Sequence, residues 1–527
     1  MTPRLGLWVA ALVATFIILS IVALFQHAET AMLSALWHDE YYWHVTRFSL
    51  KQACLSVTLS VVPAIWVAVA LHRRQFRGRD TLVKFFSTTL VMPVLVGVFG
   101  LLAIWGKSGL VTQFLHWLGI PTDFSIYGLQ GILLAHVFFN LPYSARLLLH
   151  SLQAIPTQQY KLAAHLGMSP WQRFRFIEWP RLRLQLPSVA GLVFMLCFTS
   201  FATVMALGGG PSSTTIELAI YQAIKYDFDL ATGAWLAVWQ ILLCSSFALF
   251  FQHFSKVVAV GSGSSIDERI AQPDSWFAKM GDGFAIFMVV IIVFPPLLMV
   301  LSKGLTPELW QVMFSSSLWN ALWDSLRVAL VAGTLAVSAG ISIIWSSRVL
   351  RINGYIKRAD FTELCGSLIL LTPGLVISTG LFLLLRPIAN IQQMGYGIVV
   401  LVNAMMALPY VLKTLAQPMF VVSQQYNQLC SALGVSGWTR FRLIEWRELR
   451  EPMVHACVIS FLVSMGDLSA IALFGNQDFR TLPLYLYQLL GSYQMDAAAA
   501  VAFLMLCISG GAFVVSSRLF RAQRKSC

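Results

Sequence analysis

The chain of 527 residues is 57% hydrophobic and only 11% charged, and its mean hydropathy is +0.72. An average soluble protein is about 45–50% apolar and about 25% charged. The chain has too few charges to coat several water-soluble domains, which excludes a soluble enzyme, a secreted domain and a disordered chain. The composition therefore predicts an all-α polytopic membrane protein whose surroundings are a lipid bilayer.

Apolar runs of about 20 residues, the length that crosses a bilayer core, recur along the whole sequence. The first run is longer than the h-region of a cleaved signal peptide, so we interpret it as a retained span. The run at 127–149 is the least regular, because Asn140, Pro142 and Arg146 interrupt it. About twelve spans are expected, near residues 5–25, 50–71, 82–105, 127–149, 186–207, 232–252, 283–301, 325–346, 364–385, 397–417, 453–474 and 497–516.

The distribution of positive charge predicts how these spans are oriented. When the N-terminus and every even-numbered connection are assigned to one side, that side carries 28 of the 36 Lys and Arg residues. The positive-inside rule makes this side cytoplasmic, so both termini are expected in the cytoplasm. The net charge of +13 is then explained without a nucleic-acid partner.

One segment occurs twice in the sequence. Leu166–Arg183 and Leu433–Arg450 are identical at 12 of 18 positions, at an offset of 267 residues. Weaker correspondences upstream relate Ser49 to Ser325 and Pro93 to Pro373. The chain is therefore interpreted as a duplicated six-span unit, and an even number of spans per unit makes the two halves parallel.

The polar stretch between the sixth and seventh spans marks the boundary of the halves. Residues 254–281 include a Gly/Ser run at 261–265, which is typical of a flexible linker. We expect a first permease half at 1–253, with its repeated unit at about 48–252. The second half is expected at 282–527, with its unit at about 324–516.

The duplicated segment predicts two short cytoplasmic helices joined by a turn. Gly167 is suited to end the first helix, and Ser169 can cap the next one with Pro170 at its first position. Gly434 and Ser436 occupy the same places in the second copy.

Apolar side chains recur on one face of the second short helix in each copy. This spacing suits an amphipathic segment that lies on the membrane surface. It equally suits a docking surface, and two near-identical copies favour a partner with two-fold symmetry. The residues are Trp171, Phe174 and Ile177 in the first copy, and Trp438, Phe441 and Ile444 in the second.

The two segments resemble the EAA loops of ABC importer permeases, whose pattern is E-A-A-x3-G-x9-I-x-L-P. Ala163, Gly167 and Ile177 match it in the first copy, and Gly434 and Ile444 match it in the second. The residue at the glutamate position is Lys161 in one copy and Gln428 in the other, so any contact made by that glutamate is in doubt.

The resemblance implies a type I ABC importer transmembrane fold and two loops that couple to a separate ATPase. That ATPase is expected in two copies and binds the ATP, while this chain is expected to bind no cofactor and no metal and to have no catalytic residues. A periplasmic binding protein is the other implied partner.

Longer stretches extend the resemblance to the fused permeases of bacterial thiamine and thiamine pyrophosphate importers. The matching stretches cover both halves, at residues 42–49, 127–140, 208–222 and 475–483. They imply an inner-membrane permease that carries thiamine and its phosphates by alternating access. Ferric iron is the alternative substrate, since fused permeases of similar design serve iron importers.

Asp467 is the one acidic residue well inside an expected span. A carboxylate at a helix centre costs roughly 2.5–3.5 kcal/mol on insertion scales, so it should face the bundle or a cavity. It could contact a cationic substrate on the translocation path, or bond neighbouring backbone and hydroxyl groups. An ion-coupled secondary transporter remains open as a different class of function. It should carry charged residues on several spans, and it gives no reason for the duplicated loops.

Overall fold

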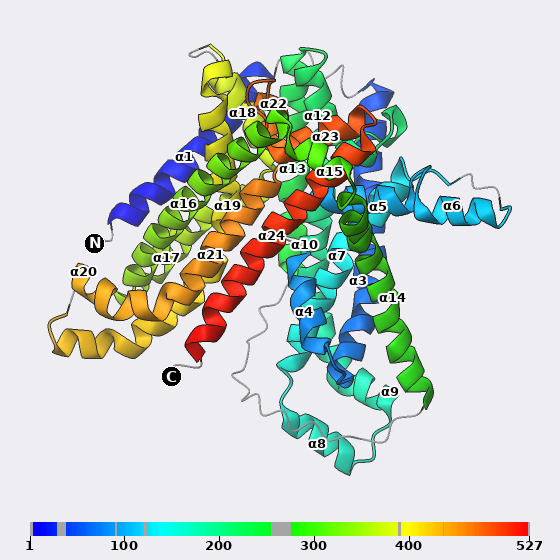
Figure 1. The fold of residues 1–527 in the computed structure, drawn as a ribbon. Coiled ribbons are helices and arrows are strands. Elements are labelled where there is room, and N and C mark those ends of the chain that lie inside the picture. The colour runs from blue at the N-terminus through cyan, green and yellow to red at the C-terminus, as the bar shows by residue number, and fades with distance from the viewer. Residues whose placement is uncertain are drawn as a thin grey trace.

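The computed structural model describes residues 4–28, 38–89, 92–120, 124–254, 276–387, 391–435 and 437–524. Every regular element in this part of the chain is helical, which confirms the all-α class (Figure 1). Eleven of the described helical stretches are long and apolar enough to cross a membrane. Most of the expected linker lies outside the described residues, and its last residues, 276–281, form the first turns of a helix.

The first half of the chain contains the elements coloured from blue to green in Figure 1. Their bounds are α1 (Arg4–His27), α3 (Glu40–Arg73), α4 (Arg79–Thr88), α5 (Val94–Trp105), α6 (Leu110–Trp117), α7 (Leu129–Gln153), α8 (Thr157–His165), α9 (Pro170–Arg173), the π-helix η1 (Phe174–Glu178), α10 (Trp179–Phe198), α11 (Phe201–Leu207), the 3₁₀-helix η2 (Pro211–Ser213), α12 (Ile216–Lys225) and α13 (Leu230–Phe254).

The second half, coloured from green to red, follows a similar order. Its elements are α14 (Trp276–Gly304), α15 (Glu308–Met313), α16 (Ser316–Ile352), α17 (Ile356–Ser367), the 3₁₀-helix η3 (Leu368–Leu371), α18 (Gly374–Leu385), α19 (Ile391–Ala432), α20 (Gly437–Arg440), the π-helix η4 (Phe441–Glu445), α21 (Trp446–Gly466), α22 (Ser469–Phe474), α23 (Leu482–Gly491) and α24 (Met495–Arg524).

The expected span at 364–385 is not one continuous helix. It is divided between the end of α17, η3 and α18, and α18 begins only after Pro373. Proline has no N–H for the helix ladder and disfavours the helical conformation at the residue before it; here Thr372 is extended, and the helix ends before Pro373. Pro93 separates α4 from α5 in the same way. The count of eleven long helices therefore differs from the twelve expected, because α18 has 12 residues and is too short to span by itself.

The correspondence between the halves extends to single hydrogen bonds. In the first half, the Ser49 hydroxyl on α3 accepts a hydrogen bond from the backbone N–H of Ile216, the first residue of α12, at 3.0 Å. In the second, Ser325 on α16 accepts one from Leu482, the first residue of α23, at 2.6 Å. Helix N-termini leave backbone N–H groups unpaired, and a serine from another helix satisfies one here.

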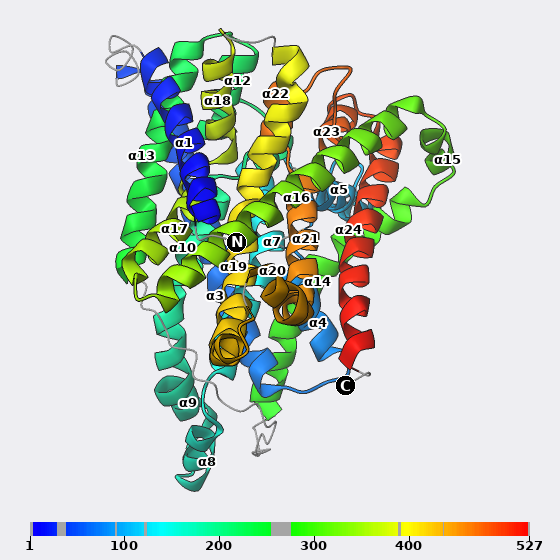
Figure 2. The ribbon, with the colours of Figure 1, turned by 90° about the vertical axis from the view of Figure 1, so that its left-hand side faces the viewer.

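The halves do not form separate bundles, because each first helix packs on the other half. Helix α1 lies against α16, α17 and α18, and α14 lies against α3, α5 and α7 (Figures 1 and 2). At one end of α14, Asp282 pairs with Arg74, which follows α3, at 2.7 Å. The two halves are therefore held together by an exchange of helices as well as by a shared face.

Small residues allow the exchanged helices to approach closely, as they do in many membrane interfaces. The backbone N–H of Gly6 donates to the Ser346 hydroxyl at 3.1 Å. A Cβ atom placed on Gly6 would lie 1.9 Å from the Ser342 carbonyl oxygen, and one on Gly380 would lie 2.4 Å from that of Ser20. No side chain fits at either contact unless the helices separate.

Replacing Gly380 by leucine is expected to destabilise the protein, because the new side chain collides with the backbone of α1. Overpacking of this kind costs about 1–3 kcal/mol, and more where backbone must move. Gly397→Leu is the matched control, since nothing lies within 4 Å of a Cβ at that position. The melting temperature of the detergent-solubilised protein should fall for Gly380→Leu alone. Equal melting temperatures would mean that α1 is not held tightly against α18.

The two ends of the molecule carry different short helices. One end carries α12, α18, α22 and α23, and we call it the α12 end (Figure 2). The other end carries α8, α9 and α20, and we call it the loop end. The helices of the two halves diverge toward the loop end, so that α8 and α20 lie far from each other (Figure 1).

Candidate functional site: the duplicated loops

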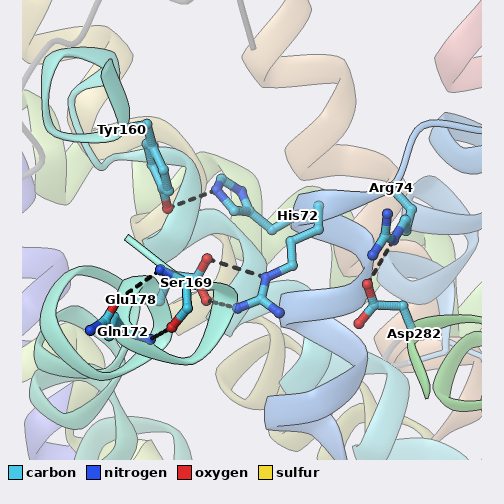
Figure 3. Close-up of polar contacts among 8 residues, drawn as sticks. His72, Arg74, Tyr160, Ser169, Gln172, Glu178 and Asp282 are labelled. Carbon is cyan, nitrogen blue, oxygen red and sulfur yellow. Dashed lines mark hydrogen bonds and ion pairs between the residues drawn. The ribbon is translucent and has the colours of Figure 1, made fainter. Parts of the chain in front are cut away.

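The first copy of the duplicated segment adopts the capped turn that its sequence predicts. Gly167 has a φ of +61°, the left-handed conformation in which glycine ends a helix at little cost. The Ser169 hydroxyl accepts a hydrogen bond from the Gln172 backbone N–H at 3.3 Å, and the Gln172 side chain accepts one from the Ser169 N–H at 2.8 Å (Figure 3). This capping box starts α9 at Pro170.

The helix that α9 begins is longer than expected. It runs through the π-helix η1 directly into α10, so the segment is the end of a long helix and not a second short one. In the second copy α20, η4 and α21 are joined in the same manner. Both copies therefore connect the turn to a membrane helix without a break.

The second copy differs from the first on the other side of its turn. Gly434 has a φ of +65°, as expected, while Ser436 and the side chain of Trp438 lie outside the described residues. The counterpart of α8 is not separate, because α19 continues through it to Ala432. Pro156 precedes α8 at the break in the first copy, whereas Ser423 stands at the corresponding place in the second, where no proline removes a backbone N–H from the helix.

The predicted aromatic face divides between the surface and the interior. Trp171 is exposed and stacks on half-buried Phe174, with ring centroids 5.6 Å apart. Phe174 in turn stacks on Trp66 of α3, at 5.9 Å. Ile177 packs against the core, and Ala163 is buried. Phe174 and Ile177 thus attach the loop to the bundle.

The second copy attaches itself to the bundle with the same two positions. Phe441 lies 6.1 Å from the ring of Trp345 on α16, and Ile444 packs against the core. Neither residue is fully exposed. Of the two predicted faces, only Trp171 among the described side chains is freely exposed for a partner.

A buried glutamate, which sequence reasoning did not single out, anchors each loop to a membrane helix. Glu178, at the end of η1, is 2% exposed and pairs with Arg73 of α3 at 2.7 Å (Figure 3). Nearby, the His72 ring and the Tyr160 hydroxyl of α8 hydrogen-bond at 3.0 Å. The end of α3 therefore contacts the loop on both sides of its turn.

Glu445, the counterpart of Glu178, is held more deeply. It is fully buried and lies 3.0 Å from both Arg348 of α16 and Arg440 of α20. Arg348 is itself 4% exposed and stacks on Trp345, with its guanidinium carbon 4.4 Å from the ring centroid. The sequence did contain a signal for these buried glutamates, because the same position is Glu in both copies of a segment that is otherwise rich in arginine.

A pair of exposed leucines is the other feature that the sequence did not reveal. Leu162 on α8 and Leu166, the residue that follows α8, are 60% and 62% exposed, and their counterparts Leu429 and Leu433 are 51% and 68% exposed. The spacing of four residues places both leucines of a pair on one helix face. An exposed apolar pair that is repeated in both halves is the pattern of an interaction surface.

Asp467 does not lie inside a continuous helix. It occupies the break between α21 and α22, where its carboxylate accepts hydrogen bonds from the Ser469 hydroxyl at 2.7 Å and the Ala470 N–H at 3.2 Å. The backbone next to it, at Gly466, faces Pro93 of the first half. Asp467 thus starts α22 at a point where the halves meet.

A lysine joins the halves at the α12 end. The ammonium of Lys225, the last residue of α12, donates to the carbonyl oxygens of Leu473 and Gly475 at 3.2 and 3.4 Å. These carbonyls end α22, and a cation at a helix C-terminus is favoured by the helix dipole. The contact closes the two halves together at the end opposite the loops.

The comparisons with known proteins agree with this architecture. Residues 56–260 and 355–521 both match the family described as the binding-protein-dependent transport system inner membrane component. The thiamine transport system permease protein of Salmonella typhimurium is 46% identical over 515 residues, which cover 98% of this chain and 96% of that protein. The corresponding protein of Haemophilus influenzae is 40% identical over 512 residues, which cover 94% and 93%.

A putative ferric transport system permease of Haemophilus influenzae is more distant, at 23% identity over 492 residues, or 90% of this chain and 77% of that protein. The expected permease, as opposed to an enzyme, is confirmed by these names. Permeases of this family work with an ABC ATPase and a periplasmic binding protein. The chain is therefore a multi-pass inner-membrane permease that belongs to the binding-protein-dependent transport system inner membrane component family, with the family unit present twice.

Proposed function

We propose that this chain forms the membrane pathway of an ATP-driven importer that carries thiamine delivered by a periplasmic binding protein. Two copies of an ABC ATPase would dock on the two loops, and alternating access would move the substrate. The choice of thiamine as the substrate rests on the near-full-length similarity to thiamine permeases. That similarity is far stronger than the similarity to the ferric transport permease. Both termini and the loop end would lie in the cytoplasm, where 28 of the 36 basic residues are expected.

The observation that carries the proposal is the repeated loop with its two distinct faces. The exposed leucines offer a site for an ATPase, and the buried glutamates tie the same segment to α3 and α16. A force applied to the loop would therefore move a membrane helix. With the halves joined at the α12 end and apart at the loop end, this arrangement suits a permease open toward the cytoplasm.

The test is the uptake of labelled thiamine at nanomolar concentration by cells with and without the gene. We expect uptake that requires the gene, falls when ATP is depleted and survives an uncoupler that spares ATP. Gene-dependent uptake that collapses with the proton gradient alone would contradict an ATP-driven importer. Absence of any gene-dependent uptake would remove thiamine as the substrate, and ferric iron would be the next cargo to measure.

A further inference from the structure

A cavity at the α12 end is lined by four tyrosines from both halves of the chain. Its volume is about 270 Å³. Tyr41 of α3, Tyr221 of α12 and Tyr226 come from the first half, and Tyr487 of α23 comes from the second. We call this cavity the tyrosine pocket. At this end the molecule would face the binding protein in the orientation proposed above, on which the present inference rests.

The tyrosine pocket leads from the surface into the interior. Tyr226 is 63% exposed, whereas Tyr221 is 6% exposed. Their rings are perpendicular, with centroids 5.7 Å apart, and Tyr221 contacts Phe201 in turn at 5.3 Å. Gly209 and Gly210 line another part of the wall without side chains. A flat molecule could therefore enter beside Tyr226 and reach Tyr221 along aromatic surface.

The electrostatic surroundings favour a positive charge. Among the described residues that line the pocket, none is charged. Two acidic residues lie beside it: the Asp39 carboxylate accepts a hydrogen bond from the backbone N–H of Tyr41 at 2.8 Å, and Asp227 follows Tyr226 in the chain. The nearby ammonium of Lys225 is directed away, to carbonyls of the second half. Aromatic faces attract organic cations, and that attraction is strongest where water is partly excluded.

We propose that the tyrosine pocket binds a flat, singly charged organic cation as it passes from the binding protein into the permease. The thiazolium ring of thiamine has this chemistry, and the cavity is slightly smaller than the roughly 300–1,000 Å³ typical of drug-sized ligands.

A cation bound in the tyrosine pocket would contact both halves of the chain, so its binding would depend on how the halves move during transport. Tyr487 belongs to the second half and the other three tyrosines to the first, so separation of the halves at this end would open the pocket. A cation held here would be released from one wall as soon as α23 moves relative to α12. Binding is thus expected to be strongest in the conformation described here.

The experiment measures the binding of thiamine and N-benzylthiazolium to the full-length permease purified in nanodiscs. The double variant Tyr226→Ala/Tyr487→Ala removes two rings, and Tyr226→Phe/Tyr487→Phe retains them. Tyr355→Ala is the control, since Tyr355 is an exposed tyrosine outside the pocket. We expect binding of thiamine to weaken about tenfold in the alanine variant and to change less than about twofold in the phenylalanine variant and the control.

The proposed site would be refuted if the alanine variant, shown by its melting temperature to be folded, bound thiamine as tightly as the wild type does. Loss of binding in the phenylalanine variant as well would also refute an aromatic site. Tyrosine-dependent binding of N-benzylthiazolium in a protein whose cells take up no thiamine would keep the pocket and reject the proposed substrate.

Discussion

Replacing Glu445 by glutamine is expected to abolish most transport and to lower the stability of the protein. The substitution removes the only charge that neutralises Arg348 and Arg440 in the ion pairs described at this site. Arg348 is 4% exposed and cannot reach water where it lies. Breaking a buried pair by removing one partner costs about 3–5 kcal/mol. The loop would then lose its attachment to α16, and movement of the ATPase would no longer reach that helix.

The measurement pairs the melting temperature of the purified permease with thiamine uptake in cells. Glu448→Gln is the matched control, because Glu448 is an exposed glutamate three residues further along the same helix. Glu178→Gln should have a smaller effect on stability, since its partner Arg73 is 18% exposed. If the Glu445→Gln variant has the melting temperature of the wild type and transports thiamine normally, the buried ion pairs neither stabilise the protein nor couple the loop to α16.

Introducing aspartate at both Leu166 and Leu433 is expected to prevent assembly with the ATPase while leaving the permease folded. Each leucine is more than half exposed, so the isolated chain should tolerate the change. Burial of a leucine in an interface contributes about 1.5–3 kcal/mol, and two such losses weaken binding at least about 100-fold. A carboxylate placed against an apolar groove adds a desolvation cost.

The amount of ATPase that co-purifies with the tagged permease measures this effect directly. Leu305→Asp is the control, because Leu305 is 65% exposed and follows α14 at the opposite end of the molecule. The single variants should each reduce assembly by less than the pair does. Full recovery of the ATPase with the double variant would mean that the repeated leucines do not form its docking surface.

The local features of the loops could be predicted from the sequence because they depend on residues close together in the chain. The positive φ of Gly167 and the capping box of Ser169 follow from glycine's freedom and the serine hydroxyl. The apolar runs likewise identified the long helices, because a bilayer demands a minimum length. The break before α18 was missed, although Pro373 was visible, since the apolar run continues across it.

The contacts that join distant segments could not be predicted in this way. Glu178 meets Arg73, and Glu445 meets Arg348, across about a hundred residues of chain. Hydropathy assigns a glutamate among arginines to a solvated surface, so its burial is visible only once the helices are packed. The tyrosine pocket combines Tyr41 with Tyr487 and has no sequence motif. The same holds for the exchange of α1 and α14, which depends on tertiary packing alone.

The exchange of first helices has a consequence for how the protein is made. Helix α1 leaves the ribosome well before its partners α16 and α18, which begin about 290 and 350 residues later. At about 5–20 residues per second, the newly made α1 waits roughly 15–70 s in the membrane before the surface that packs on α16 and α18 is covered. During that time Gly6 and the helix face around it are bordered by lipid or by a chaperone. Because both halves belong to one polypeptide, every α1 has a partner in the same chain and need not search the membrane for another.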